Sequence, residues 1–171
     1  MRSAILISEM SGSSLTFKVR GVALNQENQV PIVLLHNTKK NLLLPLVVGP
    51  FEASAIIIEL ENVQPPRPLT HDLLAQFFQK HGFRLLQLQI YGRLDDRYLA
   101  RIHYRVRLST HTMEVRPSDG IALAIRLEAP ILVSDELVSN LALSNSINSQ
   151  FDLSRSEILY LESEKPIAPM M

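Results

Sequence analysis

Alternation of apolar and polar residues predicts strands in the first part of the chain. From Leu15 to Val19 every second residue is apolar and the residues between are polar, which is the two-residue period of a strand with one buried face. This first strand is expected to continue to residue 24. Two further β-rich runs follow at 30–35 and 42–48, and polar turn clusters separate them.

Proline marks the start of two predicted helices. Pro50 opens a segment of helical composition that runs to residue 61, and Pro117 opens another that runs to about residue 128. Proline suits the first helical turn because the N–H that it lacks has no partner there. Glu52 suits the same turn because an acid favours the positive end of the helix dipole.

A third helix is predicted over residues 70–81. Thr70 is its expected N-cap, apolar residues recur on one stripe, and Gly82 stands at the C′ position that often ends a helix. The proline-rich segment 64–68 fits neither a helix nor a central strand, so we expect a rigid extended connection there. A fourth helix is expected from about residue 135 to 143.

The clearest strand pattern lies in the middle of the chain. Two runs, 84–94 and 97–108, flank the turn residues Asp95 and Asp96 and predict a hairpin. One face of the second strand is apolar or aromatic, and the other is basic: Arg97, Arg101, His103, Arg105 and Arg107. Three interpretations stay open, because this face can contact nucleic-acid phosphates, stay solvated as a guard against strand pairing, or pack against acids of another subunit.

Shorter signals follow the hairpin. Brief strands are expected at 112–116 and 130–133, and the segment 144–150 is polar. Residues 154–157, with the sequence SRSE, fit a capping box and predict a last short helix.

An internal echo indicates a duplicated unit. Residues 48–53 (VGPFEA) and 115–120 (VRPSDG) both run from a strand end through a proline to an acid two residues later. We interpret them as the junctions of a duplicated hairpin-plus-helix unit. The expected fold class is α+β, with a mixed, largely antiparallel sheet, in one domain over residues 1–143. Residues 144–171 are then expected to form a polar linker with a short C-terminal helix and tail.

Several segments, in this order, resemble the bifunctional nuclease family of bacteria and plants. They are 21–24 (GVAL), 31–35 (PIVLL), 44–53 (LPLVVGPFEA), 67–74 (RPLTHDLL), 116–124 (RPSDGIALA) and 130–131 (PI). The likeness covers roughly residues 17–137, with Gly120 standing where the family usually has alanine. The resemblance implies an α+β domain that can form homo-oligomers, with nuclease activity on DNA and RNA in some members. It supplies no agreed set of catalytic residues.

Composition and charge narrow the function classes. The 171 residues are 46% hydrophobic, and Lys+Arg and Asp+Glu both number 17, which argues against a polycation that grips nucleic acid with its whole surface. The absence of cysteine excludes disulfides, thiolate zinc sites and a cysteine nucleophile. The apolar runs at 4–7 and 42–48 are too short for a signal peptide and a membrane helix, respectively. We therefore expect a soluble cytoplasmic protein without a membrane partner.

The segments that resemble the family also carry candidate chemistry for cutting a phosphodiester. Such a reaction needs a positioned water, help for the leaving oxygen and positive charge on the other phosphate oxygens. The candidates are Glu52, His71, Asp72 and Asp119 as catalytic groups, with Arg67 and Arg116 as phosphate-binding groups. The cofactor is open, and a divalent metal such as Mg²⁺ or Mn²⁺ would use Glu52, Asp72 and Asp119. If the duplication is real, Glu52 and Asp119 face each other at equivalent helix starts.

Each candidate also has a structural interpretation. An acid in a first helical turn commonly serves only the helix dipole, and an arginine beside it can simply pair with it. The sequence thus leaves three hypotheses: a nuclease of low sequence specificity acting on DNA or RNA, a non-catalytic nucleic-acid- or protein-binding module, and a structural oligomer.

Overall fold

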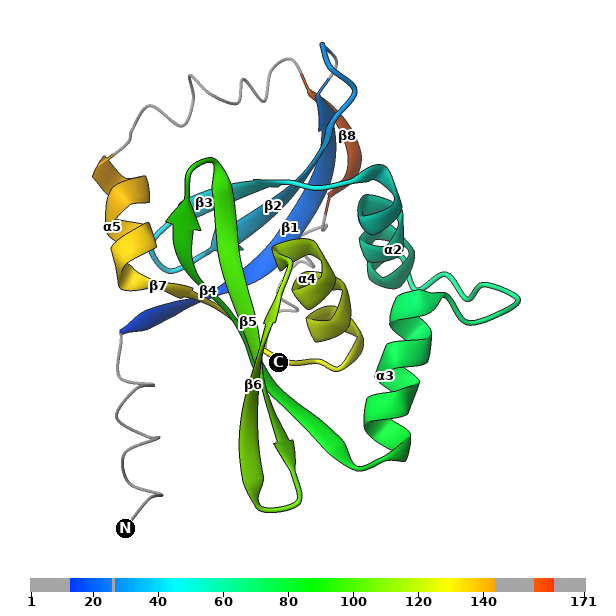
Figure 1. Ribbon diagram of the computed structural model, residues 1–171. Helices are drawn as coiled ribbons and strands as arrows, with labels where there is room; N and C mark the ends of the chain where they lie inside the picture. Colours follow the sequence, from blue (N-terminus) through cyan, green and yellow to red (C-terminus); the bar gives the residue numbers. More distant parts are fainter. Residues whose placement is uncertain (1–12, 26, 144–155, 162–171) are drawn as a thin grey trace, which may run out of the picture.

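The computed structural model describes residues 13–25, 27–143 and 156–161 (Figure 1). Its strands are β1 (Ser14–Asn25), β2 (Pro31–Asn37), β3 (Leu42–Val47), β4 (Phe83–Leu94), β5 (Arg97–Val106), β6 (Ser109–Val115), β7 (Ile131–Ser134) and β8 (Ser156–Leu161). Its helices are α2 (Pro50–Leu60), α3 (Thr70–Lys80), α4 (Pro117–Arg126) and α5 (Asp135–Leu143). Within these ranges no helix has the length and apolar character needed to span a membrane.

The strands form one mixed sheet and confirm the α+β class. The strand order is β3-β2-β1-β7-β4-β5-β6, with β8 added beside β1. The successions β1-β2-β3 and β4-β5-β6 are both antiparallel. The short strand β7 joins them, because it pairs antiparallel with the first residues of β1 and parallel with β4. That parallel pair makes the sheet mixed.

The two halves repeat the same local arrangement, in line with the predicted duplication. Each antiparallel set of three strands ends in a helix with proline at its start, α2 after β3 and α4 after β6. The N-cap residues have matching extended backbones, with φ/ψ of −74°/158° at Gly49 and −66°/141° at Arg116. Helices α2 and α4 also contact each other, so the two helix starts lie in one region of the molecule.

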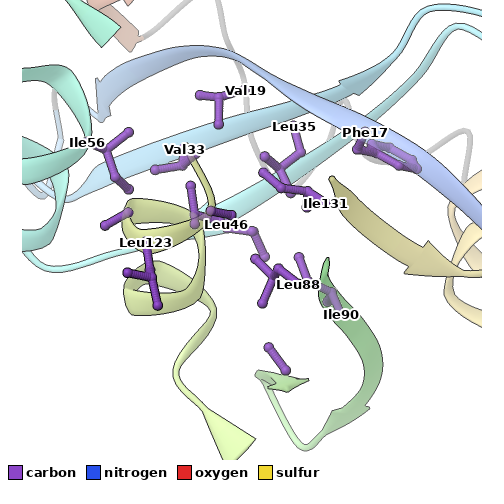
Figure 2. Packing of buried hydrophobic residues seen from close by; sticks show 14 of the residues in the cluster. Phe17, Val19, Val33, Leu35, Leu46, Ile56, Leu88, Ile90, Leu123 and Ile131 are labelled. Atoms are coloured by element: carbon purple, nitrogen blue, oxygen red, sulfur yellow. The ribbon is translucent and has the colours of Figure 1, made fainter. Parts of the chain in front are cut away.

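Helix α4 lies at the centre of the core. Its residues Ile121–Ala124 are all buried, and Figure 2 shows Leu123 in the same cluster as residues of the sheet such as Val33 and Leu46. The absence of a side chain at Gly120 matters here, because a methyl group of Leu88 lies where a Cβ would stand. The helix therefore packs closely against β4, and its first turn is held in a fixed place.

The start of α3 differs by one residue from the prediction. The N-cap is Leu69, and Thr70 is the first helical residue. The carboxylate of Asp72 accepts a hydrogen bond from the Leu69 N–H at 2.8 Å, which is the acid's half of a capping box, whereas the N-cap side chain makes no hydrogen bond. The end is as predicted, because Gly82 has φ of +69°, the left-handed conformation of a C′ residue.

The predicted C-terminal helix is wrong. Residues Ser156–Leu161 form β8, which pairs antiparallel with β1. The Tyr160 hydroxyl contacts the carbonyl of Leu60 at the end of α2. The capping-box pattern is a local signal, whereas the edge of β1 offers backbone donors and acceptors that a strand can satisfy. Ser154, Arg155 and the predicted polar linker lie outside the described residues.

Candidate functional site

Three helices begin close together, and charged side chains of their first turns contact one another. Arg116, just before α4, donates to Glu52 with 2.8 Å between Nη1 and Oε1. It also donates twice to Asp119, from Nε to Oδ2 at 2.6 Å and from Nη2 to Oδ1 at 3.1 Å. The Nε2 atom of His71, in the first turn of α3, lies 3.2 Å from the same Oδ1. We call these four residues the helix-start cluster.

The duplicated helix starts explain how two acids come to share one arginine. Glu52 and Asp119 are each the third residue of a helix that begins with proline, where the helix dipole stabilises a carboxylate. The N-cap positions differ: Gly49 precedes α2 and Arg116 precedes α4. A side chain at Gly49 would collide with the carboxylate of Glu52, which folds back over it. The first copy of the unit therefore has a glycine that leaves space for the Glu52 carboxylate, and the second copy has Arg116, the cation that binds it.

The cluster is open to solvent at its cation. The exposed fraction is 67% for the Arg116 side chain, against 32% for Asp119, 16% for Glu52 and 15% for His71. Burial would raise the pKa of Asp119, but the hydrogen bonds from Arg116 and His71 outweigh it and hold that pKa below its ordinary value. The bond to Asp119 raises the pKa of Arg116. The cation therefore remains charged while most of its surface faces water.

Asp72 is not part of this cluster, although it follows His71 directly. Its Oδ2 accepts the Leu69 N–H, and its Oδ1 accepts a hydrogen bond from Nε of Arg126 at 2.6 Å. Burial would raise the pKa of Asp72, but these hydrogen bonds lower it overall. The carboxylate that was expected to complete a metal site instead holds the start of α3 to the end of α4.

Arg126 is the residue that sequence reasoning missed. Its side chain is only 3% exposed, and it donates from Nη1 to the Ala122 carbonyl at 2.9 Å and from Nη2 to the Ala55 carbonyl at 3.0 Å. The carboxylate of Glu59 lies 3.7 Å from its Nε. We call Arg126 with its partners the Arg126 network. A basic residue in a last helical turn is common, so nothing in the local sequence indicates that Arg126 is buried.

Arg67 lies in the connection before α3, where it is exposed. It makes no ion pair in the part of the chain that the structure describes. Its predicted contact with phosphate stays a prediction.

Comparison with known proteins places this fold in a family. The family model for the bifunctional nuclease domain matches residues 33–146. The chain belongs to the bifunctional nuclease domain family. An uncharacterised protein of Mycobacterium tuberculosis (strain H37Rv) is 31% identical over 126 residues, which are 74% of this chain and 75% of that protein.

Plant members of the family are longer and more distant. Bifunctional nuclease 1 of Oryza sativa subsp. japonica is 25% identical over 141 residues, which are 79% of this chain and 42% of the rice protein. Bifunctional nuclease 2 of Arabidopsis thaliana is 27% identical over 119 residues, which are 66% of this chain and 36% of that relative. The match with this chain thus covers less than half of each of these two plant proteins.

The basic face predicted on β5 is not a continuous exposed stripe in this bifunctional nuclease domain. Arg97, Arg105 and Arg107 are exposed, but His103 is only 5% exposed. Its two ring nitrogens lie 3.1 Å from Gln89 Oε1 and 3.2 Å from the Thr112 hydroxyl. Burial lowers the pKa of His103, and the charge of a neighbouring arginine adds to this. The histidine therefore belongs to a polar network on the sheet.

Arg101 is held in the same network. It donates to Gln89 at 3.0 Å, and its guanidinium lies over the ring of Tyr91, 4.7 Å from the centroid. Strand pairing sets Glu114 of β6 opposite it, and the Tyr91 hydroxyl donates to that carboxylate at 2.8 Å. Glu114 of β6 therefore supplies a carboxylate beside the basic face of β5.

The arrangement of the helix-start cluster does not fit a divalent metal ion. The guanidinium of Arg116 bonds to both Glu52 and Asp119, and so stands where an ion shared by these carboxylates would have to lie. Asp72 is engaged by Arg126. Among the described residues no group of three or more His, Asp or Glu side chains is placed to hold a metal.

Proposed function

We propose that this chain is a nuclease that hydrolyses phosphodiester bonds of DNA or RNA with little sequence preference. The observation that carries the proposal is the helix-start cluster, in which four side chains from three family motifs contact one another. Family membership supports the reaction class and a nucleic-acid substrate, because several plant relatives bear the name bifunctional nuclease.

His71 is proposed as the group that moves the proton. In the hydrolysis a water oxygen bonds to phosphorus and the bond to the leaving oxygen breaks. One proton leaves the water and one reaches the leaving oxygen, and histidine suits both transfers at neutral pH. Asp119 contacts one ring nitrogen at 3.2 Å, which orients the ring and leaves its other nitrogen for the proton.

Arg116 is proposed to bind the phosphate. Its exposed, planar guanidinium matches the geometry of phosphate oxygens and stabilises the charge that develops on them. Glu52 and Asp119 fix its position from two sides, so it is oriented before the substrate arrives. Arg67, exposed beside the start of α3, is proposed as a second phosphate contact. Asp72 is proposed only to position the helix that carries His71.

Cleavage of labelled single-stranded DNA and RNA by purified protein tests the proposal. Wild type is compared with Asp119→Asn, in the presence of Mg²⁺ or Mn²⁺ and in EDTA. We expect wild-type turnover that persists in EDTA and falls by about a hundredfold or more in Asp119→Asn, while the melting temperature changes little. A matched control is Asp96→Asn, because Arg93 and Asp96 form an exposed pair with the same three-residue spacing.

Two results would contradict the proposal. Equal cleavage by wild type and Asp119→Asn would exclude the cluster as the site. Loss of all wild-type activity in EDTA would reject the metal-independent route and require the carboxylates to rearrange around an ion.

A structural lock is the second candidate, because both acids of the cluster are already ion-paired with Arg116. It predicts that Asp119→Asn lowers the melting temperature and that no variant changes cleavage. The cytoplasmic location and the homo-oligomeric state expected from the sequence stay predictions.

A further inference from the structure

Five aromatic rings form a row at one end of the molecule. The end of α3 and the turn between β5 and β6 lie at the same end in Figure 1. The ring centroids of Phe77 and His81 are 4.4 Å apart, and those of Phe77 and Phe83 are 5.8 Å apart. The row continues through Tyr104, 6.2 Å from Phe83, to His111, which stacks on Tyr104 at 5.4 Å and 25°.

Part of this row faces solvent. Phe77 is 48% exposed, and both histidines are exposed, whereas the two central rings are half-buried. A folded protein gains little from leaving a phenylalanine ring so open, and exposed aromatic groups of this kind commonly mark a binding surface.

The same end carries unbalanced positive charge. Four exposed cations lie on the same segments as the rings, and none of them has an ion pair within the described ranges: Lys80, Arg84, Arg105 and Arg107. Between residues 73 and 113 the only acids are Asp95 and Asp96, which lie in the turn at the far end of the β4–β5 hairpin. Since the whole chain has a formal charge of zero, the positive charge of this segment is a local excess. We call these rings and cations the basic aromatic end.

One pair of these cations is placed where like charges destabilise a sheet. Arg84 and Arg105 are directly opposite each other on β4 and β5, and like charges in that position destabilise a sheet. They stand on the reverse face from Phe83 and Tyr104, because side chains alternate along a strand. A polyanion that wraps around this end of the hairpin would offset their repulsion from the reverse face, with its bases on the side of the rings.

We propose that the basic aromatic end binds single-stranded nucleic acid, with bases stacked on the rings and phosphates on the cations. Aromatic rings beside a positive groove are the usual means of binding a single strand without sequence preference. A duplex keeps its bases stacked on each other and cannot use the rings. A second copy docked by the same end would bring like charges together, so the observations favour nucleic acid.

The basic aromatic end lies within reach of the helix-start cluster. At about 1.5 Å per helical residue, Phe77 is about 9 Å along α3 from His71. At about 3.3 Å per strand residue, His111 is about 17 Å along β6 from Arg116. The inference rests on the proposed function in this respect: a strand held at this end would lead its next phosphates towards the proposed site.

Fluorescence anisotropy tests the binding separately from cleavage. The probes are a labelled oligothymidylate of about twelve nucleotides, within the range of single-strand site sizes, and the duplex of the same length. Both carry phosphorothioate linkages that resist hydrolysis, because the proposed cleavage would continue in EDTA. A gel run afterwards shows whether the probe is intact. We expect the wild type to bind the single strand more tightly than the duplex, and Phe77→Ala to weaken single-strand binding about 5- to 100-fold.

Matched variants distinguish loss of base stacking from loss of folding, and the charge at this end of β5 from the charge at its other end. Phe77→Tyr should retain the binding, and Phe51→Ala, which removes an 87% exposed ring from α2, should leave it unchanged. Arg105→Ala should weaken binding and reduce its salt dependence by about one ion. Arg97→Ala, at the other end of β5, should do so less.

The outcomes distinguish the two proposals. Wild-type binding that Phe77→Ala does not weaken, or equal affinity for strand and duplex, overturns the inference and leaves the nuclease proposal standing. Concentration-dependent self-association that Phe77→Ala abolishes, with binding unchanged, overturns it too and assigns this end to a second copy. Loss of binding in Phe77→Ala supports the inference even if no variant cleaves.

Discussion

His71 and Asp72 are neighbours at the start of α3, yet their side chains join two different charged networks. His71 contacts Asp119 in the helix-start cluster, where the arginine side chain is 67% exposed. Asp72 pairs with Arg126, whose side chain is 3% exposed. Both networks combine an arginine with carboxylates from helix ends, so residue types alone do not tell them apart.

The two arginines differ in how much of the guanidinium remains free to bind another group. Each of the three nitrogens of Arg126 donates to the protein, to Asp72 and to the carbonyls of Ala122 and Ala55, which ties three helices together. Arg116 is fixed by two carboxylates but keeps most of its surface open to water. A buried, saturated arginine can only support the fold, whereas an exposed and oriented one can also receive an anion.

The largest expected effect comes from breaking the Arg126 network. Arg126→Met should lower the free energy of unfolding by about 3–5 kcal/mol, because the half-buried Asp72 carboxylate and the carbonyls of Ala55 and Ala122 would lose their partner. Urea denaturation measures the loss, and the double variant Arg126→Met with Asp72→Leu should recover part of it. A loss below about 1 kcal/mol would show that the Arg126 network contributes little to the stability of the fold.

Removing the exposed arginine should affect turnover and spare the fold. In Arg116→Ala we expect cleavage of single-stranded DNA to fall about a hundredfold, because the phosphate loses its oriented cation. The urea midpoint should stay close to the wild-type value, since exposed ion pairs stabilise folds only weakly. Steady-state rates and denaturation curves on the same preparation measure both, and a large fall in the midpoint would place Arg116 among the structural residues.

Acid should act on the two networks to different extents. The pKa values of Asp72 and Asp119 lie below the ordinary 3.8 because hydrogen bonds from arginine outweigh burial. Below that ordinary value the unfolded chain binds more protons than the folded one, so stability falls as the pH falls towards the folded pKa values. Urea midpoints measured between about pH 5 and pH 2 should fall less steeply in Asp72→Asn than in wild type. Asp119→Asn should give a smaller flattening, because its carboxylate is more exposed, and the reverse order would contradict the comparison.

The smallest effect is expected at the exposed pair of Arg93 and Asp96. It has the same spacing as Arg116 and Asp119, but the Asp96 side chain is 97% exposed. Asp96→Asn should change neither the melting temperature nor cleavage, because water screens such a pair. A change in cleavage would show that surface charge in general, and not the cluster, controls the rate.

The fold was predictable where the signal was local. Strand alternation and the prolines at helix starts predicted the successive strands, the hairpin and the starts of α2 and α4, because period and backbone restriction act over a few residues. The last helix was wrong because pairing of β8 with the edge of β1 is a long-range contact. His103 shares the parity of exposed arginines on β5, and only the neighbouring strands that supply Gln89 and Thr112 show it to be buried.

The candidate site was predictable in part for the same reason. The repeated proline-plus-acid pattern predicted that Glu52 and Asp119 would face each other at equivalent helix starts, and the structure places both on Arg116. The orientation of the Asp72 side chain was not predictable, because its partner Arg126 is 54 residues away. Nothing in the local sequence of Arg126 signals that it is buried.

The most direct test of the comparison is one experiment on the wild type and two variants, His71→Gln and Asp72→Asn, each measured for cleavage of single-stranded DNA and for urea unfolding. We predict that His71→Gln loses cleavage by about a hundredfold or more with its unfolding curve nearly unchanged. Asp72→Asn should lose stability while its rate per folded molecule stays near that of wild type. Cleavage that falls only in proportion to unfolding in both variants, or unchanged cleavage in His71→Gln, would contradict the assignment of function to the helix-start cluster.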